Sequence, residues 1–350
     1  MRRIVAITSL LGLLCGSASG QGQPTPQPPN QGQPAPAPPS TPPAQPAQGQ
    51  PDNQPAPPPV KPPRVVGQPQ SEQEREAWMA IERAASLEEK GQLAEKYLTQ
   101  FPESGLTPFA HQILAFRYQQ ANDYDNFVLH AEKSLEEVPD NPVLLALLGA
   151  AYAQRDQADK ATARAQQALQ LLERMVKPAN MSEADWVMNK EQLEADSRYA
   201  LGVASLARQA QNPAATVTED QNLKAAIAEL EKAIELDPAH DRGYFQLGFA
   251  FAKQNNAEKS IQAYARAAAI GGPVQALARE QLGKVYEFVF KNTEGVEQVI
   301  EREKEYINQK VAQRQARLQA IQTAAPPAQP TSPASPQPAP PQPAPPAPQP

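Results

Sequence analysis

The chain has 350 residues, 40 of them proline, and a formal net charge of −6. Residues 71–322 carry 37 Asp and Glu against 28 Lys and Arg, and this acidic body argues against nucleic acid and anionic lipid as main partners, because both reward clustered Lys and Arg. Cys15 is the single cysteine, and this excludes an intramolecular disulfide.

Residues 1–20 have the pattern of a secretory signal peptide. Arg2 and Arg3 precede an apolar run, residues 4–14, that is too short to cross a bilayer core as a helix, and small residues follow it. We therefore expect cleavage before Gln21 and an exported protein, periplasmic or secreted, with an uncleaved anchor as the alternative.

Cys15 leaves a second alternative at this end of the chain. Residues 13–16 resemble a lipobox, but Leu14 stands where a small residue is normal. Anchoring by a lipid on Cys15 would bring membrane contact. Otherwise the cysteine is removed with the signal, and the mature chain has no thiolate nucleophile and no cysteine metal site.

Proline-rich tracts are predicted to flank a helical body. Residues 21–70 form a Pro/Gln-rich linker and residues 323–350 a Pro-rich tail, and both are predicted to be disordered with polyproline II character. Each tract could act as a spacer or as a Pro-rich ligand for another protein. The alternative is that the tracts only keep the protein in solution. Residues 71–322 between them are rich in helix formers.

The body is predicted to be all-α. Ser71 and Glu74 fit a capping box at its start, and no stretch alternates convincingly as a strand. Short breaks separate the helical segments, at residues 102–105, 122–123, 139–142, 155–156, 177–182, 212–219, 237–238, 255–256, 271–273 and 291–293.

A Leu-Gly pair recurs along this body. The pairs are Leu148-Gly149, Leu201-Gly202, Leu247-Gly248 and Leu282-Gly283, and the side chains three residues after each glycine are Tyr152, Ser205, Phe251 and Tyr286. Further residues recur at matching offsets, namely Ala161, Ala168, Ala226, Ala233, Pro238, Tyr264 and Ala267. The period is 34 residues, as between Leu114 and Leu148.

This pattern resembles the tetratricopeptide repeat, best in residues 108–174 and 223–271. The resemblance implies an α-α superhelix, a solenoid of about five to six helical hairpins, with a non-repeat helical bundle as the alternative. Small residues at Gly149 and Gly248 would let two helices cross closely. Residues 209–220 add length inside one hairpin, residues 72–101 form a poorly matching capping hairpin, and residues 293–321 form a long charged carboxy-terminal cap.

The sequence offers no catalytic constellation. The three histidines are single, although His111 and His130 could approach each other across one hairpin, and no metal-binding or phosphate-binding motif is present. We therefore expect that the protein is not an enzyme and binds neither a cofactor nor a metal. An enzyme or ligand carrier is kept as the least favoured function.

The family resemblance also implies a concave groove lined by the first helix of each hairpin. Its positions in this chain are Phe109, Gln112, Phe116, Val143, Ala146, Ala150, Asp196, Tyr199, Val203, Arg242, Phe245, Phe249, Leu277, Glu280 and Lys284. The Lys, Asn and Arg set by which chaperone-binding members clamp a carboxylate is lacking. Aromatic residues over small alanines suit an apolar peptide or amphipathic helix, while packing on the chain's own helices or on a second copy is the alternative.

These features predict an exported scaffold or adaptor that binds a protein or peptide in its groove. The alternative is a structural protein of the cell envelope, an assembly factor or spacer acting through its Pro-rich tails. Residues 101–104 favour that alternative weakly, because this turn resembles helical-repeat proteins of bacterial outer-membrane assembly. Self-association is left open.

Overall fold

The computed structural model describes residues 64–211 and 220–324, in which every element of regular structure is a helix. The expected signal segment, residues 21–63 of the linker and almost all of the Pro-rich tail lie outside the described residues. The all-α prediction is confirmed. One helical domain was expected over residues 71–322, and the structure has two compact units, which meet in the chain between Pro139 and Asp140.

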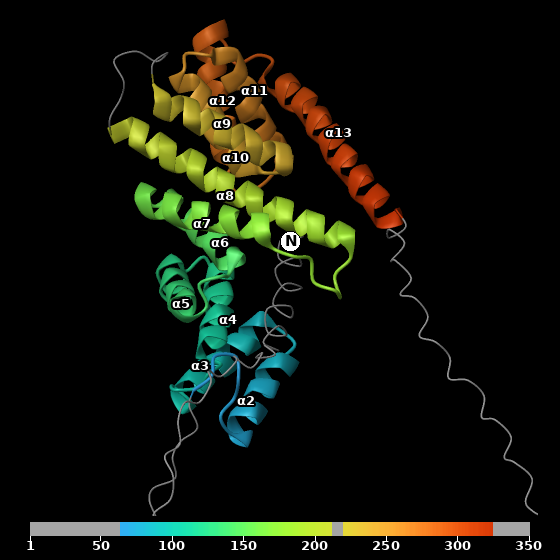
Figure 1. Ribbon diagram of the computed structural model, residues 1–350. Helices are drawn as coiled ribbons and strands as arrows, with labels where there is room; N and C mark the ends of the chain where they lie inside the picture. The colour runs from blue at the N-terminus through green and yellow to red at the C-terminus, as the bar shows by residue number, and fades with distance from the viewer. Residues whose placement is uncertain (1–63, 212–219, 325–350) are drawn as a thin grey trace, which may run out of the picture. The chain divides into compact units, whose positions relative to one another are not determined.

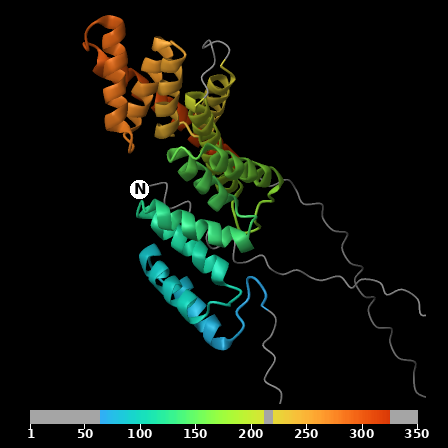
Figure 2. The same ribbon diagram turned by 90° about the vertical axis from the view of Figure 1, so that its left-hand side faces the viewer.

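Unit 1 consists of two helical hairpins, α2 (Glu72–Arg83) with α3 (Leu87–Gln100) and α4 (Thr107–Gln120) with α5 (Tyr124–Glu137). Their course can be followed in Figures 1 and 2. Trp78 and Tyr97 pack edge to face in the core of this unit, with ring centroids 5.5 Å apart.

The beginning of unit 1 is held by polar contacts that start before the first helix. Ser71 Oγ accepts a hydrogen bond from Glu74 N at 3.2 Å, as the capping box predicts, and Glu74 Oε2 accepts from Gln70 N and Ser104 Oγ at 2.9 Å each. Arg64 donates to Ser104 O at 3.0 Å. Residues 64–70, which the sequence assigned to the linker, therefore contact the helical part of unit 1.

Unit 2 contains the remaining helices (Figure 1). They are α6 (Pro142–Gln154), α7 (Ala158–Arg174), α8 (Glu183–Gln211), α9 (Gln221–Leu236), α10 (Asp241–Lys253), α11 (Ala257–Ile270), α12 (Gln275–Phe290) and α13 (Val296–Thr323). The pairs α6/α7, α8/α9 and α10/α11 form hairpins, and α7 contacts α8 and α11 contacts α12 in the stack.

The recurring glycines lie where two helices of a hairpin cross, with one exception. A Cβ at Gly248 would lie 2.6 Å from the Tyr264 ring, and one at Gly202 would lie 2.6 Å from Leu230. A Cβ at Gly149 would lie 3.2 Å from the backbone of Ala165. A Cβ at Gly283 would meet no other described atom within 4 Å, apart from its chain neighbours and its own helix backbone, because no second helix packs there.

α13 does not end the stack as a cap. Its buried Ile300, Glu303 and Ile307 pack against α11, and Arg266 on α11 binds Glu303 at 2.7 Å. Farther along, Arg317 binds Glu191 on α8 at 2.6 Å. The sequence predicted the length and the charges of this helix. Its course along α11 to α8 depends on contacts between residues far apart in the chain.

Candidate functional site

The predicted groove residues fall into two groups in the structure. Gln112, Phe116, Tyr199 and Val203 are buried, at no more than 8% exposure. Phe109, Arg242 and Phe245 are half-buried, while Phe249 is 40% exposed. The first group packs inside the protein, and the exposed residues of the predicted groove are Phe249 on α10 and Leu277, Glu280 and Lys284 on α12.

α10 and the neighbouring α12 present exposed apolar side chains, which we call the α10–α12 surface. It consists of Arg242, Phe245 and Phe249 on α10 and Leu277 and Phe288 on α12. Residues 242, 245 and 249 share one helical face, as do residues 277, 284 and 288. Leu277 is 45% and Phe288 75% exposed. The sequence analysis missed Phe288, although its spacing from Leu277 would have placed it on the same face.

Side chains at this surface already contact one another within the protein. Lys253 Nζ lies 5.3 Å from the centre of the Phe249 ring, and Lys284 pairs with Glu280 at 2.6 Å. The Phe245 ring packs on Tyr264, with centroids 5.5 Å apart, and is thereby fixed in place. A fixed aromatic ring beside an exposed one is suited to burying an apolar side chain of a partner.

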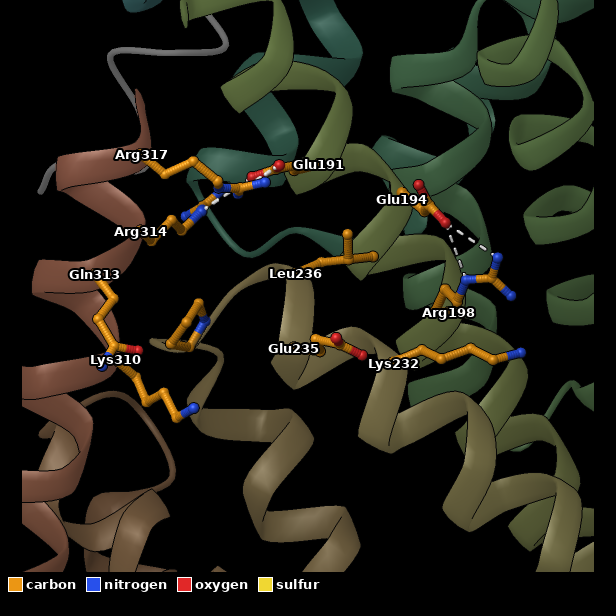
Figure 3. A pocket seen from close by; sticks show the side chains of 11 residues that line it. Glu191, Glu194, Arg198, Lys232, Glu235, Leu236, Lys310, Gln313, Arg314 and Arg317 are labelled. Carbon is orange, nitrogen blue, oxygen red and sulfur yellow. Dashed lines mark hydrogen bonds and ion pairs between the residues drawn. The ribbon is translucent and has the colours of Figure 1, made fainter. Parts of the chain in front are cut away.

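A charged cavity of about 540 Å³ lies between α8, the end of α9 and α13 (Figure 3). Its walls are formed by Glu191, Glu194, Arg198, Lys232, Glu235, Leu236, Pro238, Lys310, Gln313, Arg314 and Arg317. Figure 3 shows Arg314 and Arg317 reaching from α13 to Glu191, at 3.2 and 2.6 Å. Arg198 is likewise held by Glu194 and Glu229.

The ion pairs within the cavity have a structural role. Most of its charges already have a partner within the protein, so they hold α13 against α8 and α9. Apart from Pro238, which follows α9, the cavity contains no residue of the predicted groove or of the repeat signature. Sequence reasoning missed it because Glu191 and Arg317 are far apart in the chain.

His111 and His130 meet across the α4/α5 hairpin, as the sequence allowed. Their Nδ1 atoms are 2.9 Å apart, so one ring donates and the other accepts. Burial, followed by the neighbouring His130 charge, lowers the pKa of His111 to about 4, and burial also lowers the pKa of His130. Both rings are therefore neutral near pH 7, and the pair is a structural contact of unit 1.

Other titratable groups are also held in unreactive states. Burial raises the pKa of Tyr199 and of Tyr264 to about 12, so both phenols stay protonated. Within residues 64–211 and 220–324, no group of three or more His, Cys, Asp or Glu side chains is placed to hold a metal. None of the described helices combines the length and the apolar character needed to cross a membrane.

Comparison with known proteins finds a family model that matches part of the chain and several similar structures. The model of the tetratricopeptide (TPR) repeat matches residues 218–255, which include α9 and α10. None of the curated proteins matches the sequence.

The similar solved structures include the MamA protein, with 19% identity, 64% of this chain and all of that chain covered, and a TM-score of 0.32. Yeast Tom70 has 15% identity, covers 64% of this chain and 41% of its own, and has a TM-score of 0.41. PilW, described as a widely conserved type IV pilus biogenesis factor, has 14% identity, 66% and 99% coverage, and a TM-score of 0.38.

Proposed function

We propose, from the premise that this chain is a tetratricopeptide-repeat protein, that it is an exported adaptor without catalytic activity of its own. The TPR fold typically mediates binding between proteins. The adaptor role, the export and the binding surface are the proposal. The partner is a peptide or amphipathic helix that buries apolar side chains on the α10–α12 surface.

The observation that carries this proposal is the exposure of Phe249, Leu277 and Phe288 on neighbouring helices. Single exposed apolar residues are ordinary, but several on two helices that contact each other favour an interaction surface. Aromatic side chains in particular contribute most of the binding energy where they become fully buried. The paired charges of the cavity between α8, α9 and α13 support structure rather than chemistry.

Site-specific photocross-linking tests where the partner binds. A photoreactive residue is placed at position 249, at position 277 or, as a control, at the exposed Lys224 on α9. We expect the same partner to be captured from positions 249 and 277 and not from 224. Capture at equal yield from all three positions would contradict the assigned surface.

The substitution Phe249→Asp tests the energetic contribution of the surface to binding of the captured partner. We expect affinity to fall at least tenfold, about 1.4 kcal/mol, because an exposed ring that is buried on binding is replaced by a charge. Leu129→Asp is the matched control, since Leu129 on α5 is similarly exposed, at 48%. Unchanged circular dichroism shows that both variants fold, and equal affinities would refute the proposal.

The proposed export rests on Arg2, Arg3 and the apolar run that follows them. Intact-mass measurement of the protein purified from its native host distinguishes the outcomes. A chain beginning at Gln21 supports export in free form. A lipid-modified chain beginning at Cys15 supports anchoring, and an intact amino terminus contradicts cleavage.

A further inference from the structure

We infer that the face of α12 centred on Gly283 is a docking surface for the same face of a second copy of this chain. The α10–α12 surface lies on a different face of α12, so this inference is independent of the proposed function. It starts from the recurring glycines, which in the other three hairpins lie against a second helix.

α12 is the first helix of a hairpin whose second helix is missing. At Gly248 the second helix α11 brings the Tyr264 ring to within 2.6 Å of the position that a Cβ would take, whereas no described atom comes within 4 Å of that position at Gly283. The next helix, α13, instead runs along α11 and reaches α8. Among the described residues, the face of α12 that would contact a second helix is therefore left without a packed helix, although its Arg279 forms an ion pair with Glu297 on α13.

The residues of this face follow helical spacing. Ala276, Arg279, Gly283, Glu287 and Phe290 are separated by three or four residues and lie on one side of α12. Four of them are exposed and Gly283 is half-buried. Phe290 is 52% exposed, and its ring packs on Tyr286 with centroids 4.4 Å apart.

This face is complementary to itself when two copies run antiparallel. A two-fold axis through Gly283 places Arg279 opposite Glu287 of the other copy, because each is four residues from the axis. Ala276 then lies opposite Phe290, at seven residues from the axis. The two-fold axis repeats each contact, so the interface has two Arg–Glu ion pairs and two contacts between Ala276 and Phe290. These contacts surround a close crossing of the two helices at Gly283.

The charges of the free protein are compatible with this pairing. Arg279 is bound by Glu297 at 2.6 Å, but both side chains are exposed, at 42% and 70%, so exchange of Glu297 for Glu287 of the second copy costs little. Charge complementarity favours a second copy over an unrelated partner. An unrelated partner would need the same sequence of basic, small, acidic and aromatic groups.

The expected dimer is weak. The 16 residues of α12 make a helix about 24 Å long, and one such helix pair buries less than the roughly 1,200–2,000 Å² of a stable interface. A dissociation constant on the order of 1–100 µM follows for such a contact. Dimerisation is then controlled by the local concentration of the chain.

Sedimentation equilibrium of the full chain at about 1–200 µM tests the inference. We expect reversible dimerisation that Arg279→Glu and Glu287→Arg each weaken at least tenfold and that the double variant restores. Glu297→Gln is the control and should leave dimerisation unchanged. A monomer at every concentration, or a double variant weaker than either single variant, would overturn the inference.

A cysteine cross-link tests the position of the axis. In full chain carrying Cys15→Ser, Gly283→Cys should form an intermolecular disulfide, because a residue on the axis meets its own copy. Lys224→Cys on α9 should not. Cross-linking at equal rates would contradict the placement, and it would do so without bearing on partner binding by the α10–α12 surface.

Discussion

At the scale of single residues, the His111–His130 pair makes unit 1 sensitive to acid. The folded protein holds the pKa of His111 at about 4, below the ordinary value of 6.5, so the unfolded chain binds more protons as the pH falls. The pair's contribution to stability is present above about pH 6.5 and is lost progressively toward pH 4. Discounted for solvent screening of two half-exposed rings, the loss amounts to about 1 kcal/mol.

Thermal unfolding of the full chain at several pH values measures this effect. The double variant His111→Gln/His130→Gln is the reference, because it keeps polar groups at both sites but titrates at neither. We expect the difference in Tm between wild type and variant to change by a few degrees between pH 7 and pH 4. A constant difference would show that the two rings do not titrate abnormally.

Two glycines of the repeat pattern should respond oppositely to alanine. Gly248→Ala places a methyl group against the buried Tyr264 ring, and overpacking of this kind costs about 1–3 kcal/mol. Gly283→Ala meets no neighbour and gains the helix propensity of alanine, about 0.5–1 kcal/mol. Urea unfolding, at protein concentrations too low for dimerisation, measures the change in unfolding free energy for both variants. Equal changes would contradict the different packing around the two glycines.

At the scale of elements, helix boundaries were predictable and the course of α13 was not. Asn122, Asp156 and Asn255 lie in left-handed turns between helices, and polar residues of this kind are readable in a sequence as breaks. Ser71 likewise begins α2 as expected. α13 is positioned by ion pairs such as Arg317 with Glu191, and no local pattern indicates a contact over such a separation.

The second half of α13 is held mainly by charge. Its buried residues, Ile300, Glu303 and Ile307, belong to the first half, whereas Arg314 and Arg317 hold the second half to Glu191 across the cavity. We expect Glu191→Gln to speed hydrogen exchange in residues 311–323 with a cost of about 1–3 kcal/mol, because Arg314 loses a charged partner.

A matched control separates this effect from a general loss of charge. Glu301→Gln removes an exposed carboxylate that pairs with Lys304 on the same helix, at 3.3 Å. It should leave hydrogen exchange in residues 311–323 unchanged, since exposed pairs contribute little. Equal hydrogen exchange in the two variants would contradict the conclusion that Glu191 anchors α13.

At the scale of the whole molecule, the 34-residue period indicated hairpins but not which faces stay exposed. Tyr199 illustrates the difference, because the family pattern placed it in the groove and the structure buries it beside His240, with ring centroids 5.0 Å apart. Periodicity records contacts that recur in each hairpin. The packing of α13 along α11, by contrast, comes from an element that does not recur.

The similar crossings at Gly149, Gly202 and Gly248 have a consequence for how such a chain changes during evolution. A gene duplication that adds one full period adds a hairpin whose inner and outer contacts already match its neighbours, so the core need not be redesigned. An insertion of any other length must be accommodated between helices. Insertions of whole repeats therefore preserve the existing contacts between helices.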